Sequence, residues 1–184
     1  MEGVTRRVSF ADLQRMPDDG NRYELYDGEL RVVPSPLLRH QIVSQRLLLV
    51  LVEYANGCGG QVVQPPMDLV LTDYDVVQPD LMYFGPAGAA GLDPNDWVRV
   101  CPDLAIEVLS PSTARIDRGR KRELFERFRI PEYWIVDPDA PRIEVSVLDV
   151  DRYASPLVVT SSRLQSPTLT GLTVEIEPLF AGLT

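Results

Sequence analysis

Residues 101–137 read CPDLAIEVLSPSTARIDRGRKRELFERFRIPEYWIVD, and the rest of the chain is best understood around them. The stretch predicts a buried strand with one acid in its middle, a Ser/Pro loop, a helix that carries a lysine, and a second buried strand. An acid inside one strand and a lysine on the helix that follows it point to a chemical role for this part of the chain.

The acid in the first strand is Glu107. Period-two alternation over residues 104–109 places Glu107 between Ala105 and Leu109 on one face, while the other face is wholly apolar. A lone buried carboxylate is costly unless it is paired, hydrogen-bonded or bound to a metal. Glu107 therefore needs a partner, and either a salt bridge to an arginine or a functional site would provide one.

The lysine is Lys121, the one lysine among 18 basic residues. Its predicted helix begins with Asp117 as the N-cap and ends at Ile130, before Pro131. Apolar side chains follow Lys121 at i+3, i+4 and i+7, so that it heads the buried stripe: Leu124, Phe125 and Phe128. A lysine at the end of a stripe can extend its amine to water, but an ammonium group also shifts its pKa readily near a buried site.

The bulk properties limit the classes of protein. The 184 residues, 45% of them hydrophobic, suffice for one domain with a proper core. We expect a single domain over residues 1–184, with a helix and hairpin in 1–36, the catalytic core in 37–137 and additional strands in 138–184. Cys58 and Cys101 are too few for a disulfide framework, which indicates a reducing cytoplasm. No apolar run approaches a membrane span and no signal peptide opens the chain.

A net charge of −9 weighs against tight non-specific binding to DNA, because no broad basic surface is expected. This net charge does not exclude a local basic patch, and four arginines beside Lys121 supply one: Arg115, Arg118, Arg120 and Arg122.

The segments before this stretch are predicted from turn and capping signals. Residues 1–22 indicate a short amphipathic helix capped by Ser9. Residues 22–33 predict a hairpin around a type I′ turn at Asp27 and Gly28, which places Glu24 opposite Arg31. That pairing predicts a cross-strand ion pair as the structural role of Glu24.

Residues 37–56 show the longest helical pattern and end in a glycine run. Its apolar positions at helical spacing are Leu38, Ile42, Leu48, Leu49, Val52 and Ala55. The sole histidine, His40, lies in the first turn, where it is either a structural hydrogen-bonding group or an accessory site residue.

Strands are predicted at residues 61–64, 67–71 and 76–84, and the last of these contains Asp80 directly after Pro79. Further strands are predicted at residues 142–150, 157–162 and 172–177, followed by a short segment that caps the core.

Two acids and a lysine suggest phosphodiester hydrolysis. Two carboxylates about 4 Å apart repel by roughly 4 kcal/mol at an effective dielectric near 20, so they attract a cation or share a proton. Oxygen ligands with open positions suit Mg²⁺, which bridges to phosphate oxygens, and a nearby lysine can orient the attacking water. Glycosidases also use two acids but need no buried lysine.

The motifs that carry a family resemblance are Pro79-Asp80, IEVLSPST at residues 106–113, Lys121, and PEYWIVDP at residues 131–138. With RYELYDGEL at residues 22–30 and His40, they resemble the large bacterial Uma-two family of restriction-endonuclease-like proteins, within the PD-(D/E)XK nuclease superfamily. The likeness covers nearly the whole chain. It implies an α/β fold with a central mixed sheet flanked by helices, an N-terminal hairpin and additional C-terminal strands.

The resemblance also implies site roles. Asp80 and Glu107 match the two metal-binding acids, and the main-chain carbonyl of Val108 is a possible further ligand. Lys121 matches the lysine that this group carries on the following helix, whereas the superfamily motif would place a lysine at Leu109. Glu24 matches a secondary acid in the hairpin.

The sequence thus predicts a Mg²⁺-dependent endodeoxyribonuclease, with Mn²⁺ as a substitute and no organic cofactor. Its expected partners are DNA, contacted through Ser112, Thr113, Arg115 and Arg118, and a second copy of the chain in a homodimer. Two alternatives remain, namely an inactive nucleic-acid-binding module of the same fold and a dimeric interaction protein that uses the C-terminal strands.

Overall fold

The computed structural model describes residues 7–160 and 162–183, so the first six residues of the predicted N-terminal helix lie outside the described ranges. Its strands are grouped into a large mixed sheet, a smaller antiparallel sheet and a separate two-stranded sheet. The strands are β1 Arg22–Tyr26, β2 Glu29–Val33, β3 Gln61–Val63, β4 Leu69–Val70, β5 Val76–Val77, β6 Leu81–Phe84, β7 Leu104–Val108, β8 Glu132–Asp137, β9 Arg142–Asp149, β10 Arg152–Tyr153, β11 Leu157–Val159, β12 Arg163–Gln165 and β13 Thr173–Glu175.

The large sheet has the order β10-β9-β8-β7-β6-β3, with β11 paired to β9. Strands β7 and β8 are parallel, whereas β7 pairs with β6 in the antiparallel sense. Parallel neighbours need a crossover connection, and the helical segment between β7 and β8 supplies it. The helices are α1 Phe10–Leu13, α2 Leu38–Cys58, α3 Pro86–Ala89, α4 Ala114–Ile116, the π-helix η1 Asp117–Lys121, α5 Arg122–Arg127 and α6 Ile176–Phe180.

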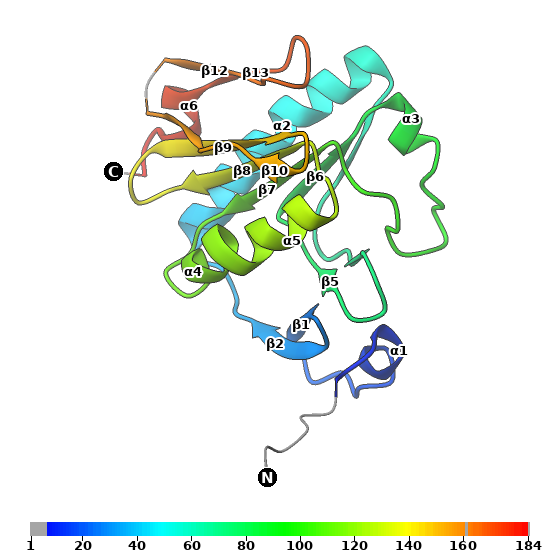
Figure 1. Cartoon of the computed structure of the whole chain (residues 1–184). Helices are drawn as coiled ribbons and strands as arrows, with labels where there is room; N and C mark the ends of the chain where they lie inside the picture. Colours follow the sequence, from blue (N-terminus) through cyan, green and yellow to red (C-terminus); the bar gives the residue numbers. More distant parts are fainter. Residues whose placement is uncertain (1–6, 161, 184) are drawn as a thin grey trace.

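Helices cover both faces of the large sheet, as Figure 1 shows with α5 in front of it and α2 behind it. The alternation predicted for β7 is confirmed. Ile106 and Val108 belong to the core layer shared with α2 and α6, and Ala105 and Leu109 belong to the layer shared with α5. A mixed sheet flanked by helices is the predicted fold class, which is therefore confirmed.

The N-terminal hairpin has the predicted register, with Tyr26 opposite Glu29 and Glu24 opposite Arg31. Positive φ angles of 52° at Asp27 and 78° at Gly28 give the expected type I′ turn. The hairpin belongs to the smaller sheet, order β2-β1-β5-β4, which lies below the large sheet in Figure 1. The site described below is at the junction of these two sheets.

The apolar positions predicted to face the core in α2 were right only in part. Ala55 is buried as predicted, but Leu38 and Leu49 are 75% and 64% exposed, and the helix also buries Val43, Leu47 and Leu51. The run LLLVLV at residues 47–52 is apolar on every side, so periodicity alone does not select the buried face. The C-terminal glycine signal was right, because Gly59 ends the helix with a φ of 78°.

Three other boundaries differ from the prediction. The segment 76–84 is two strands, β5 and β6, because Gln78, Pro79 and Asp80 interrupt it. The last predicted strand turns into α6 after Glu175. The helix of Lys121 begins at Ala114, so Asp117 is inside the helical segment and is not its N-cap. No helix in residues 7–160 and 162–183 is long and apolar enough to cross a membrane.

Candidate active site

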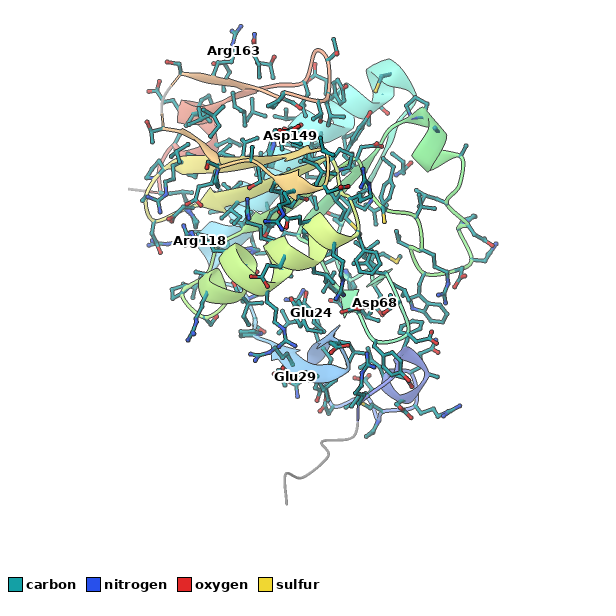
Figure 2. The ribbon with its side chains drawn as sticks, viewed as in Figure 1. Glu24, Glu29, Asp68, Arg118, Asp149 and Arg163 are labelled. Carbon is teal, nitrogen blue, oxygen red and sulfur yellow. The ribbon has the colours of Figure 1, made fainter. Side chains whose placement is uncertain are left out.

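A cavity of about 200 Å³ lies where the hairpin meets β7 and the π-helix. Figure 2 shows Glu24 at this junction, between the large sheet and the hairpin. The acidic and basic side chains that line the cavity come from segments far apart in the sequence: Arg22, Glu24, Arg31, His40, Asp80, Glu107, Asp117 and Lys121. The structure therefore brings together all four predicted catalytic residues around one cavity.

Lys121 is the centre of the charged cluster. Its side chain is only 5% exposed, and its Nζ atom lies 2.9 Å from Glu24 Oε1 and 2.9 Å from Glu107 Oε1. Asp117 Oδ1 is 3.8 Å from the same ammonium group. The partner of Glu107 is thus the lysine, which excludes the arginine salt bridge that the strand alone left open. Three buried carboxylates face one ammonium group.

Glu24 is held by two further hydrogen bonds. The Tyr26 hydroxyl donates to Glu24 Oε2 at 2.8 Å, and the main-chain N–H of Gln78 donates to Oε1 at 2.9 Å. Arg31 sits opposite Glu24 in the strand register, but its guanidinium pairs with Glu29 Oε1 at 2.7 Å. The predicted cross-strand ion pair is therefore replaced by a buried contact with Lys121.

Asp80 is tied to the strand that carries Glu107. Its Oδ2 atom accepts a hydrogen bond of 2.9 Å from the main-chain N–H of Val108 and lies 3.0 Å from His40 Nε2. His40 is itself buried, so the first turn of α2 fixes the orientation of Asp80. His40 therefore lines the cavity and contacts Asp80, and its accessory role stays a prediction.

The electrostatics of the cluster follow from burial and from excess negative charge. Burial raises the pKa of Glu107 well above its usual range, and repulsion from Asp80, Asp117 and Glu24 adds to this, while Lys121 opposes it. Burial also raises the pKa of Asp117. Burial disfavours the charged form of Lys121, but attraction to Glu107 and Glu24 outweighs it and raises the pKa of the ammonium group. Lys121 therefore stays charged in a cluster that is short of positive charge.

Asp117 is a site residue that the sequence reasoning missed. It is 2% exposed, and its Oδ2 atom has no hydrogen-bond partner among the described residues. The π-helix η1 carries it, and such turns often occur at functional sites. The sequence did contain a signal, because Asp117 precedes Lys121 by four residues and therefore shares its helix face.

The side chains around the cavity offer few ligands to a metal ion. No group of three His, Cys, Asp or Glu side chains within residues 7–160 and 162–183 is arranged to hold an ion. Mg²⁺ does not require one, since it keeps several waters and is usually bound through one or two carboxylates and substrate phosphates. Asp80 and Glu107 line one cavity, and Asp80 contacts the strand residue next to Glu107. The residues present fit a sparsely ligated Mg²⁺ ion.

The predicted DNA-contacting residues divide into two groups. Ser112 and Thr113 line the cavity, and Arg115 is exposed on the helix that follows. Arg118 does not line the cavity, because it pairs with Glu144 at 2.8 Å and Asp137 at 3.5 Å. The remaining arginines of the predicted basic patch also make internal contacts, Arg120 with Glu29 and Arg122 with the main chain of β10.

Two arginines at the cavity mouth were not selected from the sequence. Arg22 and Arg31, on the two strands of the hairpin, line the cavity together with the site acids. The hairpin register could have indicated both. Arg22 is two residues before Glu24 on β1 and shares its face, and Arg31 is directly opposite Glu24 on β2.

The large mixed sheet carries Glu107 on β7, with Asp80 directly before β6 and Lys121 on the helical crossover that follows β7. This is the arrangement that the resemblance to restriction-endonuclease-like nucleases predicts. Residues 10–177 match the Uma2 family, which is described as "Putative restriction endonuclease", and the chain belongs to that family. The predicted resemblance is thereby confirmed.

A solved structure with the same fold comes from Anabaena variabilis ATCC 29413, titled as "a putative nuclease belonging to DUF820". The two chains share 17% sequence identity with a TM-score of 0.79, over 96% of this chain and 99% of the other. No curated protein matched the sequence.

Proposed function

We propose that the protein is a Mg²⁺-dependent endodeoxyribonuclease that hydrolyses phosphodiester bonds in the cavity around Lys121. The observation that carries the proposal is the charge balance of the buried cluster, in which Glu24, Glu107 and Asp117 face a single ammonium group, with Asp80 beside them. A buried cluster with this excess of negative charge favours a divalent cation. Membership of the Uma2 family supports the same activity.

Asp80 and Glu107 would hold the ion, with the main-chain carbonyl of Val108 as a further oxygen ligand. Bound Mg²⁺ supplies Lewis-acid polarisation of the scissile phosphate. His40 keeps Asp80 oriented through the contact between Nε2 and Oδ2. Mn²⁺ prefers similar oxygen ligands and would substitute for Mg²⁺.

Lys121 would position the attacking water and offset the negative charge that develops on the phosphate in the transition state. Its Nζ atom is the cationic group next to Glu107, and burial of its side chain keeps the ammonium in place. Glu24 restrains the same ammonium from the opposite side, through a contact that Tyr26 and Gln78 hold in position. Glu24 is therefore a positioning residue.

The proposed substrate is DNA, although the chain as a whole is acidic. Phosphate contacts would come from the cavity mouth, where Arg22 and Arg31 lie on the hairpin and Ser112 and Thr113 lie on the loop before α4. Cleavage of both strands of a symmetric duplex is simplest with two copies of the site, so a homodimer is the expected assembly.

Nicking of supercoiled plasmid DNA by the purified full chain tests the activity. We expect nicking that requires Mg²⁺ or Mn²⁺, stops on chelation, and falls by at least roughly 10²-fold in Glu107→Gln, the order expected when a transition-state interaction is lost. Glu175→Gln is the matched control, because Glu175 is an exposed glutamate paired with Arg163 on the separate two-stranded sheet.

Two outcomes would contradict the proposal. Metal-dependent nicking that persists at full rate in Glu107→Gln would place the chemistry elsewhere. Divalent-ion binding with no cleavage of any DNA would instead favour the alternative of an inactive binding module with the same fold.

A further inference from the structure

A second cavity, of about 390 Å³, adjoins the active site. Gln78 is part of the wall of both cavities. Its main-chain N–H donates to Glu24 Oε1 at 2.9 Å, and its side-chain Nε2 donates to Asp68 Oδ1 at 2.7 Å. Figure 2 shows Glu24 and Asp68 at the same junction between the sheets. The two cavities therefore lie next to each other, with Gln78 in the wall of both.

The second cavity has an aromatic wall. Trp97 lines it and is 41% exposed, which is unusual for so large a side chain. Its ring packs edge-to-face on Phe10, with centroids 5.2 Å apart and an interplanar angle of 86°. This contact restrains the orientation of the indole, which lines the cavity. A rigid, exposed indole is a stacking platform for a flat ligand.

The carboxylates of Asp68 and Asp96 supply acceptors to the cavity, while Asn95 and Trp97 also carry N–H donors. Asp68 is partly buried, and burial raises the pKa of its carboxyl group, which the hydrogen bond from Gln78 only partly offsets. Gln78 Oε1 is buried and has no hydrogen-bond partner among the described residues. Among the residues that the structure describes, no lysine or arginine lines this cavity. It therefore suits a flat ligand that carries N–H donors, and it does not suit a phosphate group.

We propose that this cavity binds one nucleobase of the substrate strand, stacked on Trp97 with its N–H donors directed to the carboxylate of Asp68. This inference rests on the proposed nuclease function, because that function makes the ligand a nucleic acid. Guanine presents two adjacent N–H donors on its Watson–Crick edge, which suit a carboxylate, so guanine is the preferred base. Such a base must leave the stack of a duplex or come from a single strand.

The test uses a protein that binds without cutting, the full-length Glu107→Gln variant, and the trinucleotides d(TGT), d(TAT), d(TCT) and d(TTT). Tryptophan fluorescence reports on this cavity, because the other tryptophan, Trp134, is fully buried. We expect quenching by all four trinucleotides, with d(TGT) bound most tightly. Calorimetry with the same ligands gives an affinity that does not depend on the fluorophore.

Added to the same background, Trp97→Ala should weaken calorimetric binding by roughly 5- to 100-fold, the range seen when a base-stacking aromatic is removed. Asp68→Asn should leave the stacking in place and abolish the preference for d(TGT), because the amide NH2 group of asparagine would face the N–H donors of guanine. Tyr74→Ala is the matched control, because Tyr74 is a 37% exposed aromatic that lines neither cavity.

Equal binding of all four trinucleotides by Trp97→Ala and its parent would overturn the base pocket, even if the wild-type chain nicks plasmid DNA. Conversely, trinucleotide binding that depends on Trp97 in a chain that cuts no DNA would support the pocket and overturn the nuclease. The two proposals therefore fail by different results.

Discussion

Replacement of Lys121 by methionine tests the charge balance of the site directly. Methionine keeps much of the length of the side chain but removes the ammonium group that lies 2.9 Å from both Glu24 and Glu107. Removal of one partner from a buried ion pair costs about 3–5 kcal/mol, because the other charge is left without compensation. In a chain of this size, each kcal/mol lowers the melting temperature by about 2–4 °C. Lys121→Met should therefore melt roughly 6–20 °C below the wild type at neutral pH.

The pH dependence of this loss has a definite sign. Without the ammonium group, the largest opposition to the burial and repulsion that raise the pKa of Glu107 and Asp117 is lost. A carboxyl group with a raised folded-state pKa binds its proton more tightly when folded, so stability falls as the pH rises above the unfolded-state pKa, about 4. The difference in melting temperature should be small near pH 4.5 and large near pH 8. Differential scanning calorimetry over this range measures it.

The matched control is Arg163→Met, which removes a cation 2.6 Å from Glu175 in a pair whose side chains are 58% and 51% exposed. Exposed pairs contribute about 0–1 kcal/mol, so this variant should melt within about 4 °C of the wild type. Equal melting temperatures for the two variants at every pH would show that the buried acids need no cation, and the charge argument for the site would then fail.

Three further predictions concern single residues. Glu107→Gln should be more stable than the wild type near pH 8, because it removes a carboxyl group whose raised pKa makes stability fall with rising pH. The same variant should no longer gain melting temperature when Mg²⁺ is added. Glu132→Ala should destabilise by about 3 kcal/mol or more while Mg²⁺ stabilisation persists, because this buried carboxylate accepts hydrogen bonds from Trp134, Ser166 and Thr168 away from the cavity. Gly28→Ala should cost about 1–2 kcal/mol in urea unfolding, because φ is 78° and a Cβ would lie 2.6 Å from Arg7 Cβ.

Local patterns predicted the hairpin and the strand β7 correctly. The Asp27-Gly28 pair fixes the turn type, and the turn fixes the register between β1 and β2. In β7, strict alternation assigned each side chain to one of the two faces of the strand. Both faces are buried, and Glu107 is the one charged position. These features depend on neighbours in the sequence, which is why the sequence alone was sufficient.

Two features of the site could not be predicted in the same way. The partner of Glu24 was taken to be Arg31, its neighbour across the hairpin, whereas the actual partner Lys121 comes from the other side of the cavity. Asp117 was read as a helix cap, since acids are frequent at helix starts, but the helix begins at Ala114. Both misses arise because local rules were applied where long-range packing decides the contacts.

The position of the lysine explains how this chain departs from the superfamily motif and still assembles the cluster. The motif expects a lysine at residue 109, on the same face as Glu107, but Leu109 is 5% exposed and belongs to the apolar layer with Leu124 and Phe125. That layer fastens the helical crossover to the sheet, and the same crossover carries Lys121 to Glu107 Oε1. A lysine at 109 would remove an apolar contact that holds the helix in place. Leu109 therefore helps to hold the helical segment that places Lys121 beside Glu107. For this reason Leu109→Lys should not restore the melting temperature that is lost in Lys121→Met.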